Sequence, residues 1–307
     1  LGETLVAFIK APRALWGINV PYVLEGLSYF GILTILGKFC SENVALTDPQ
    51  AGWVYGGVTG GITFAMLLLG GVVDKIGVRT ALLLSLATMA VGRFIVSLSG
   101  TLPLGAGIFS PMFFTMVGGL LLMVTAYGLY QPAAYAGVKR YTNPQTAAMG
   151  YAVLYSLMNL GAFIAGYVAD ISMDFGESIF PPNGLTAVFW AFTAITVISV
   201  LSCALILTRK VDKHAVARVK REKQEMQESG KIEKSTDIPS EPQPKAKIHN
   251  TKLIMYSVLT VLSLVWLVFV FNSDTGLVIR IGFVLVSVAL LALSVWEFLR
   301  YRPEHPF

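Results

Sequence analysis

Long apolar runs are the feature that most constrains what this chain can fold into. Hydrophobic residues make up 55% of the sequence and charged residues only 13%, whereas roughly 25% of a soluble protein is charged. Each run is close to the ~20 residues that a helix needs to cross a ~30 Å bilayer core. We therefore expect an all-α, polytopic membrane protein. Its eight expected spans lie at about 14–37, 50–73, 80–99, 111–138, 146–171, 186–208, 252–272 and 277–299.

Positively charged residues divide the loops into two alternating sets. One set is rich in Lys and Arg, and it contains Lys75, Arg79, Lys139, Arg140, Arg300, Arg302 and a basic run that begins at Arg209. The other set contains Lys38 and little else that is positive. Because positive residues concentrate on the cytoplasmic side of a membrane, we expect both ends of the chain to be cytoplasmic.

A polar segment divides the chain into two membrane units. Of its 23 Lys and Arg residues, 12 lie between Arg209 and Lys252, in a charged helix followed by a Pro-rich linker. This basic run is interpreted either as a solvated tether near anionic lipid or as a protein-docking site. The expected parts are an interfacial segment at 1–13, a six-helix bundle at 14–208, a linker at 209–251, a transmembrane hairpin at 252–300 and a tail at 301–307.

A short charged turn, GGVVDKIGVRT, lies between the second and third runs. It places Asp74, Lys75, Gly77 and Arg79 within six positions, starting four residues after Gly70. The pattern resembles the loop between helices 2 and 3 of the major facilitator superfamily (MFS), although Val78 stands where a basic residue is common. The resemblance implies a gating loop. A carboxylate in this position can accept hydrogen bonds from the start of a neighbouring helix and pair with arginine.

Three further stretches resemble the proton-coupled oligopeptide transporters, a family within the MFS. They are YVLEGLSYFGILTIL in the first run, YQPAAYAGVKRY in the fourth and YAVLYSLMNLGAF in the fifth. The resemblance implies an MFS-type six-helix amino-terminal half followed by a two-helix hairpin, in a bacterial inner membrane. It also implies a secondary transporter of a small polar solute, coupled to protons.

The charged residues of that family's motifs are largely replaced here. Tyr22 and Gly26 stand where the first-helix motif has glutamate and arginine, and Gln131 stands where the fourth helix has lysine. These departures favour an alternative function. The chain would then be a transport-inactive, MFS-derived accessory subunit that packs against other membrane proteins.

Two ionisable residues lie deep within the predicted spans. Glu25 is near the middle of the first span, and Arg93 lies about two-thirds of the way to the outer surface in the third. Ionisable groups at such depth are costly unless paired or wetted, so both are candidates for proton coupling; a permanent structural pair is the alternative. Neutral polar residues are expected to line a substrate cavity around them: Asn19, Tyr22, Tyr29, Tyr127, Tyr130, Gln131, Tyr155 and Asn159.

Glycine is concentrated in the second and fourth runs. The fourth run contains Gly118, Gly119, Gly128 and Gly137. Small residues allow helices to approach closely. The pattern therefore indicates either helices that slide against one another or tight packing in a static bundle.

The sequence offers no catalytic, metal or nucleic-acid site. His214, His249 and His305 are scattered in the polar linker and tail, and no zinc or phosphate-binding motif occurs. We therefore expect no enzyme activity, no cofactor and no nucleic-acid partner. The lipid bilayer is the expected environment, and Cys40 and Cys203 are expected to be packing residues.

The six-helix unit is expected to work with a second half. MFS transporters rock two six-helix halves about a central site, and one half alone would expose its polar face to lipid. We expect the missing carboxy-terminal half to lie in the same polypeptide or in a second chain.

The predicted topology can be tested with a cysteine introduced at Ser240 in the polar linker. A membrane-impermeant maleimide should label it only from the cytoplasmic side, because the linker follows an even number of spans. Labelling of intact cells from outside would show that the orientation is reversed.

Overall fold

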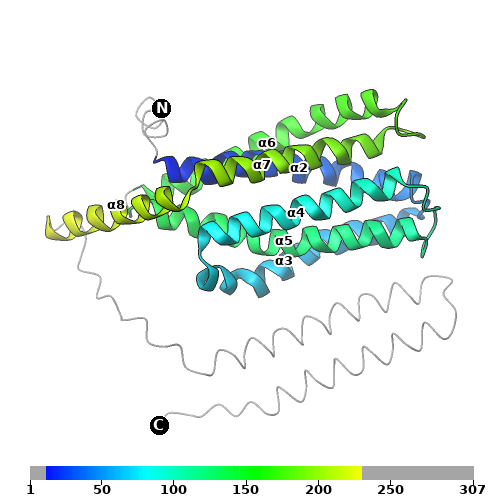
Figure 1. The fold of residues 1–307 in the computed structure, drawn as a ribbon. Coiled ribbons are helices and arrows are strands. Elements are labelled where there is room, and N and C mark those ends of the chain that lie inside the picture. Colours follow the sequence, from blue (N-terminus) through cyan, green and yellow to red (C-terminus); the bar gives the residue numbers. More distant parts are fainter. Residues whose placement is uncertain (1–11, 145, 230–307) are drawn as a thin grey trace, which may run out of the picture. The chain divides into compact units, whose positions relative to one another are not determined.

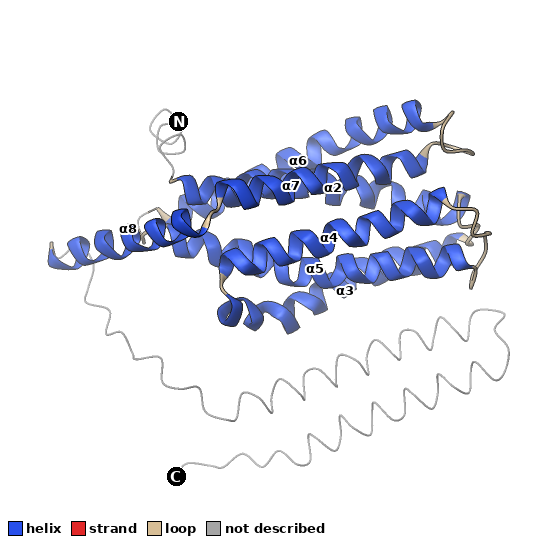
Figure 2. Cartoon of the chain, in the orientation of Figure 1, coloured by secondary structure: helices blue, strands red, loops and turns tan. Residues whose placement is uncertain are grey.

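The computed structural model describes residues 12–144 and 146–229, and every secondary-structure element of this part is a helix (Figure 2). The helices are α2 (Arg13–Glu42), α3 (Asp48–Ile76), α4 (Val78–Thr101), α5 (Pro111–Tyr141), α6 (Ala147–Gly176), α7 (Leu185–Ile206) and α8 (Arg209–Glu228). The expected hairpin at 252–300, the tail at 301–307 and most of the interfacial segment at 1–13 lie outside the described residues.

Helices α2 to α7 are each long and apolar enough to cross a membrane. They coincide with the first six spans predicted from the sequence, which are thus confirmed as helices. Most of them run a few residues past the apolar stretch. For example, α2 continues to Glu42 and α5 to Tyr141, because backbone hydrogen bonding does not stop where the hydrophobic run ends.

The six helices run alongside one another in a bundle (Figure 1). Helix α2 packs against α6 and α7, α4 packs against α5 and α7, and α3 packs mainly against α5. In α3 and α6 most side chains are outside the core, and α6 exposes a row that includes Tyr155, Phe163 and Phe175. These two helices therefore border the bundle, while α2, α4, α5 and α7 supply most of its centre.

A single residue, Gly77, separates α3 from α4. Its φ of 81° lies in the left-handed region that favours glycine. The Gly77 amide donates to the Val73 carbonyl at 2.9 Å, and the Gly77 carbonyl accepts from the Ala81 amide at 3.0 Å. The charged turn predicted from the sequence is therefore a tight joint between two long helices.

Helix α8 is the charged helix predicted after the sixth span, and it projects beyond the end of the bundle at which α2 begins (Figure 1). Two of its acids face the bundle. Asp212 accepts from Tyr141 Oη at 2.8 Å and pairs with Arg140 Nε at 3.3 Å, and Glu222 accepts from Asn143 Nδ2 at 2.9 Å. These contacts fasten α8 to the end of α5, so its exposed surface is predominantly basic.

Glycines allow two of the helix contacts to be very close. A methyl group added at Gly119 of α5 would lie 2.6 Å from the carbonyl oxygen of Gly92 in α4. One added at Gly161 of α6 would lie 2.5 Å from the carbonyl oxygen of Val23 in α2. Backbone atoms cannot move aside as a side chain can, so these positions require glycine. They support the tight-packing interpretation at these positions but not along α3, where no described residue lies within 4 Å of a methyl group added at Gly56, Gly57, Gly60 or Gly71.

The role of these glycines can be tested with two neighbouring positions in α5. Gly119→Ala should lower the stability of the bundle by about 1–3 kcal/mol, because the methyl group has no room. Gly118→Ala should have little effect, because nothing lies within 4 Å of that position. Thermal unfolding of the detergent-solubilised variants would compare them, and equal losses would contradict the close α4–α5 contact.

Candidate functional site

The two ionisable residues predicted deep in the membrane meet in the structure. Glu25 of α2 is 2% exposed and Arg93 of α4 is fully buried. Their side chains form a two-pronged ion pair, with Arg93 Nη1 donating to Glu25 Oε1 at 3.1 Å and Arg93 Nη2 lying 2.9 Å from Glu25 Oε2. Although Arg93 was expected nearer the outer surface, the two groups thus share one depth.

Side chains from two further helices complete the pair. Tyr127 of α5 accepts from Arg93 Nη2 at 2.8 Å and donates to Glu25 Oε2 at 3.2 Å. Thr196 of α7 accepts from Arg93 Nη1, and its own hydroxyl donates to the Phe192 carbonyl at 2.7 Å. We call Glu25, Arg93, Tyr127 and Thr196 the ion-pair cluster. It joins α2, α4, α5 and α7 through the centre of the bundle.

The charges of the ion-pair cluster balance each other, and most of its hydrogen bonds are made within it. A buried charge is tolerated when it is paired and its hydrogen bonds are satisfied. Both carboxylate oxygens of Glu25 are occupied, and the positive charge of Arg93 balances the negative one. Only Arg93 Nε lacks a hydrogen-bond partner among the described buried atoms of this cluster. The arrangement therefore holds a neutral pair rather than a carboxylate that is open to solvent.

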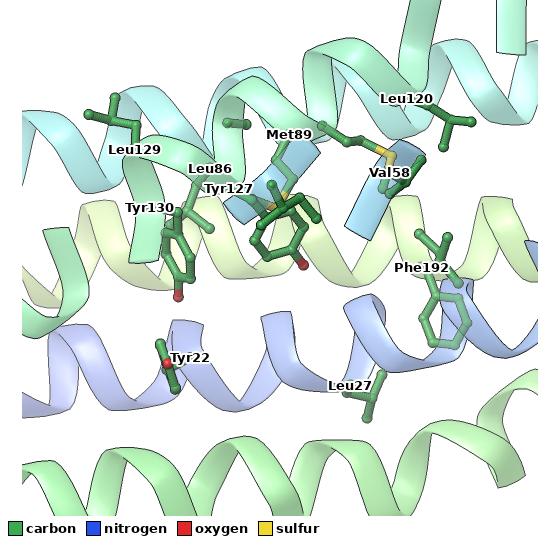
Figure 3. Close-up of a cluster of buried hydrophobic side chains, with 14 of the residues drawn as sticks. Tyr22, Leu27, Val58, Leu86, Met89, Leu120, Tyr127, Leu129, Tyr130 and Phe192 are labelled. Atoms are coloured by element: carbon green, nitrogen blue, oxygen red, sulfur yellow. The ribbon is translucent and has the colours of Figure 1, made fainter. Parts of the chain in front are cut away.

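Several predicted cavity residues surround the cluster. Tyr22 donates to Gln131 Oε1 at 2.8 Å and stacks against Tyr130, with ring centroids 6.0 Å apart. Tyr29 packs edge-on against Tyr127 at 4.9 Å. Figure 3 shows Tyr127 and Tyr130 pointing from α5 toward α2, where Tyr22 lies. The structure thus brings together the tyrosines of α2 and α5 that the sequence suggested.

Two buried polar atoms near these tyrosines have no hydrogen-bond partner among the described residues. They are Asn19 Oδ1, three residues before Tyr22 on α2, and Tyr130 Oη. Both side chains are at least nine-tenths buried. An unpaired buried polar atom costs about 1–3 kcal/mol, so these atoms favour a partner that reaches them from between the helices.

The two predicted cavity residues of α6 are placed differently. Tyr155 and Asn159 are exposed, and Asn159 Nδ2 donates to the Tyr155 carbonyl of its own helix at 2.9 Å. Neither has a described contact with Glu25 or with the tyrosines of α2 and α5. They lie on the outward face of a border helix.

Sequence reasoning did not single out Thr196, which belongs to the ion-pair cluster, or the stacked pair Tyr135 and Tyr151. Thr196 was overlooked because a threonine in an apolar helix usually satisfies itself on the preceding turn, and nothing in the sequence shows that it also binds Arg93. Tyr135 and Tyr151 stack with ring centroids 5.9 Å apart. The sequence showed only that these two tyrosines lie in the fourth and fifth spans, and it did not show that their rings meet.

The charged residues of the predicted gating loop have different surroundings in the structure. Arg79 Nε donates to the Leu207 carbonyl at the end of α7, at 2.6 Å, so this base ties α4 to α7 within the bundle. Asp74 is exposed and has no hydrogen bond or ion pair within residues 12–144 and 146–229, and Lys75 is exposed beside it. An Asp74–Arg79 pair is not formed, and Asp74 remains accessible to a group outside the described bundle.

Neither cysteine forms a disulfide. Cys40 and Cys203 are free and buried, in agreement with their interpretation as packing residues. Within the described ranges, no group of three or more His, Cys, Asp or Glu residues could hold a metal ion.

A bundle of long apolar helices is the architecture of a polytopic membrane protein. The family model described as Major Facilitator Superfamily matches residues 21–301. The chain therefore belongs to the Major Facilitator Superfamily and is an integral membrane protein.

Solved peptide-transporter structures share the fold at low sequence identity. A bacterial homologue of the human drug peptide transporters PepT1 and PepT2 matches with a TM-score of 0.57 and 17% identity, over 66% of this chain and 43% of that one. Tetrameric PepTSo2 matches with a TM-score of 0.57 and 16% identity, over 90% and 57%. A structure from a study of proton dependent oligopeptide transporters matches with a TM-score of 0.58 and 16% identity, over 84% and 53%.

The chain thus spans about half the length of these structures, with 43% to 57% of each covered. Their likeness supports the fold predicted from the sequence motifs, an amino-terminal half similar to that of the oligopeptide transporters.

The ion-pair cluster can be tested by removing one charge or both. Glu25→Gln and Arg93→Met should each lower stability by about 3–5 kcal/mol, since each leaves an unpaired buried charge. The double variant Glu25→Gln/Arg93→Met should recover most of the loss. Thermal unfolding would measure the series, and additive losses in the double variant would contradict a permanent pair.

Proposed function

We propose that this chain forms one half of a secondary active transporter for a small polar solute. Membership of the Major Facilitator Superfamily carries the proposal, and the structural likeness to peptide transporters supports it. Because the chain covers only about half of those structures, the solute pathway requires a second half. That second half would lie in the same polypeptide or in a second chain.

The bundle has the properties that a rocking half needs. The ion-pair cluster and the glycine contacts hold α2, α4, α5 and α7 together. In alternating access, two such rigid halves move about a central site. The second half would cover the outward residues of α3 and α6, and Asp74 would meet it at the cytoplasmic rim, where a gating loop acts.

We further propose that Glu25 supports the bundle rather than carrying the coupling proton. Proton uptake by Glu25 would require Arg93 and Tyr127 to release its carboxylate, and both contacts lie in a fully packed centre. A coupling proton, if transport uses one, would then bind elsewhere in the complete transporter. The bacterial inner membrane, with both ends of the chain in the cytoplasm, is part of the same proposal.

Transport can be tested with protein purified from its native membrane and reconstituted in vesicles. We expect uptake of small polar solutes to exceed that of protein-free vesicles. If a pH gradient drives the uptake, the double variant Glu25→Gln/Arg93→Met should keep this dependence, because it preserves the fold without the carboxylate. Loss of the pH dependence in the double variant would return Glu25 to the coupling mechanism.

One outcome of the purification and uptake measurements would contradict the proposed transport function. Absence of uptake for every solute, with migration in a stoichiometric complex with other membrane proteins, would contradict transport and support an accessory subunit.

A further inference from the structure

The centre of the described bundle has no free charge. Glu25 and Arg93 are the charged residues in the middle of helices α2 to α7, and each neutralises the other at 2.9 Å. The other charged residues of these helices lie within about two turns of a helix end. A solute at mid-depth would therefore meet no charged partner on this half.

What this half does offer is tyrosine: Tyr22, Tyr127 and Tyr130 lie toward mid-depth, whereas Tyr135 and Tyr151 lie within about two turns of a helix end. Tyr22 and Tyr130 stack at 6.0 Å, Tyr127 meets Tyr130 at 6.4 Å, and Tyr135 stacks with Tyr151 at 5.9 Å. The two groups are connected because the side chain of Tyr22 interacts with that of Tyr135, and the set reaches the surface of the described bundle at Tyr135, which is 42% exposed. We call Tyr22, Tyr127, Tyr130, Tyr135 and Tyr151 the tyrosine set. It joins α2, α5 and α6.

Neutral hydrogen-bonding groups lie within the same set. Gln131 accepts from Tyr22, which fixes the amide between α2 and α5. Tyr130 Oη and Asn19 Oδ1 have no partner among the described residues, although both are buried. Such atoms favour a ligand or water that supplies the missing hydrogen bonds. Aromatic rings favour stacking partners, and none of these groups compensates a charge.

We propose that the tyrosine set, together with Asn19 and Gln131, binds an aromatic solute that carries hydrogen-bonding groups but no charged ends. This inference rests on the proposed transport function and narrows its solute class. A peptide whose free ends lie beside Tyr22, Tyr127 and Tyr130 would bring an ammonium and a carboxylate to mid-depth, where this half has no free charge to pair with them. Desolvating charges in that way is costly, so this half disfavours free peptides and favours their capped equivalents.

Four versions of one dipeptide provide a matched test. Phenylalanyl-alanine would be used with both ends free, with the amino end acetylated, with the carboxyl end amidated, and with both ends capped. Binding would be measured by calorimetry on protein purified from its native membrane. We expect the doubly capped form to bind at least about tenfold more tightly than the free form, because only the free form buries two unpaired charges.

Two tyrosines supply the matched variants. Tyr135 is 42% exposed and Tyr167 is 63% exposed, and each has an aromatic neighbour with a centroid 5.9 Å away. Only Tyr135 belongs to the tyrosine set. Tyr135→Ala should weaken binding of the doubly capped dipeptide, Tyr135→Phe should retain most of it, and Tyr167→Ala should leave it unchanged.

The possible outcomes separate this inference from the proposed function. Tighter binding of the free dipeptide would overturn the inference and leave transport intact. Equal weakening by Tyr135→Ala and Tyr167→Ala would also overturn it, by removing the assigned site. Failure of all four versions to bind would overturn it as well, whereas transport itself is decided by the uptake measurement.

Discussion

The bundle depends on a charge pair in an environment that does not tolerate single charges. Glu25 and Arg93 lie in the middle of helices whose other central residues are uncharged, and a lone charge at that depth is expensive. Pairing lowers the cost of burying both charges, and Tyr127 and Thr196 supply further hydrogen bonds, which leaves only Arg93 Nε of the cluster without a partner among the described residues. Because the partners come from α2, α4, α5 and α7, their alignment restricts how these helices can slide.

Close backbone contacts at glycines also hold these helices against one another. Helices in a membrane gain little from the hydrophobic effect, so they associate through van der Waals contact and hydrogen bonds. The contact of Gly92 with Gly119 brings α4 onto α5, and the contact of Gly161 with Val23 brings α6 onto α2. Arg79 adds a hydrogen bond from α4 to the end of α7. These contacts hold the helices together and leave the outer faces of α3 and α6 uncovered by the described residues.

The neutral centre connects this architecture to solute choice. Because the acid and the base neutralise each other, the proposed solute would be recognised on this half by tyrosine rings, hydroxyls and amides. Such groups orient a solute through hydrogen bonds and bury its surface by stacking, without the desolvation cost of a charge. The replacement of charged motif residues by Tyr22, Gly26 and Gln131 is consistent with this chemistry. In helices α2 to α7, charged residues are confined to one internal pair and to positions near the helix ends.

The positions of the six described spans, the tight turn at Gly77 and the charged helix after α7 could all be predicted from the sequence, because hydrophobic length, glycine and charge act locally. The sequence also singled out Glu25 and Arg93 as buried ionisable residues. It did not show that they pair, since their contact joins positions 68 residues apart and depends on how α2 and α4 pack. Likewise, only the packing shows that Gly119 is at a close contact whereas Gly118 is not, and that Thr196 binds Arg93. Packing also decides that Arg79 of α4 donates to the Leu207 carbonyl at the end of α7 and does not pair with Asp74. These outcomes depend on contacts between helices, which no local pattern encodes.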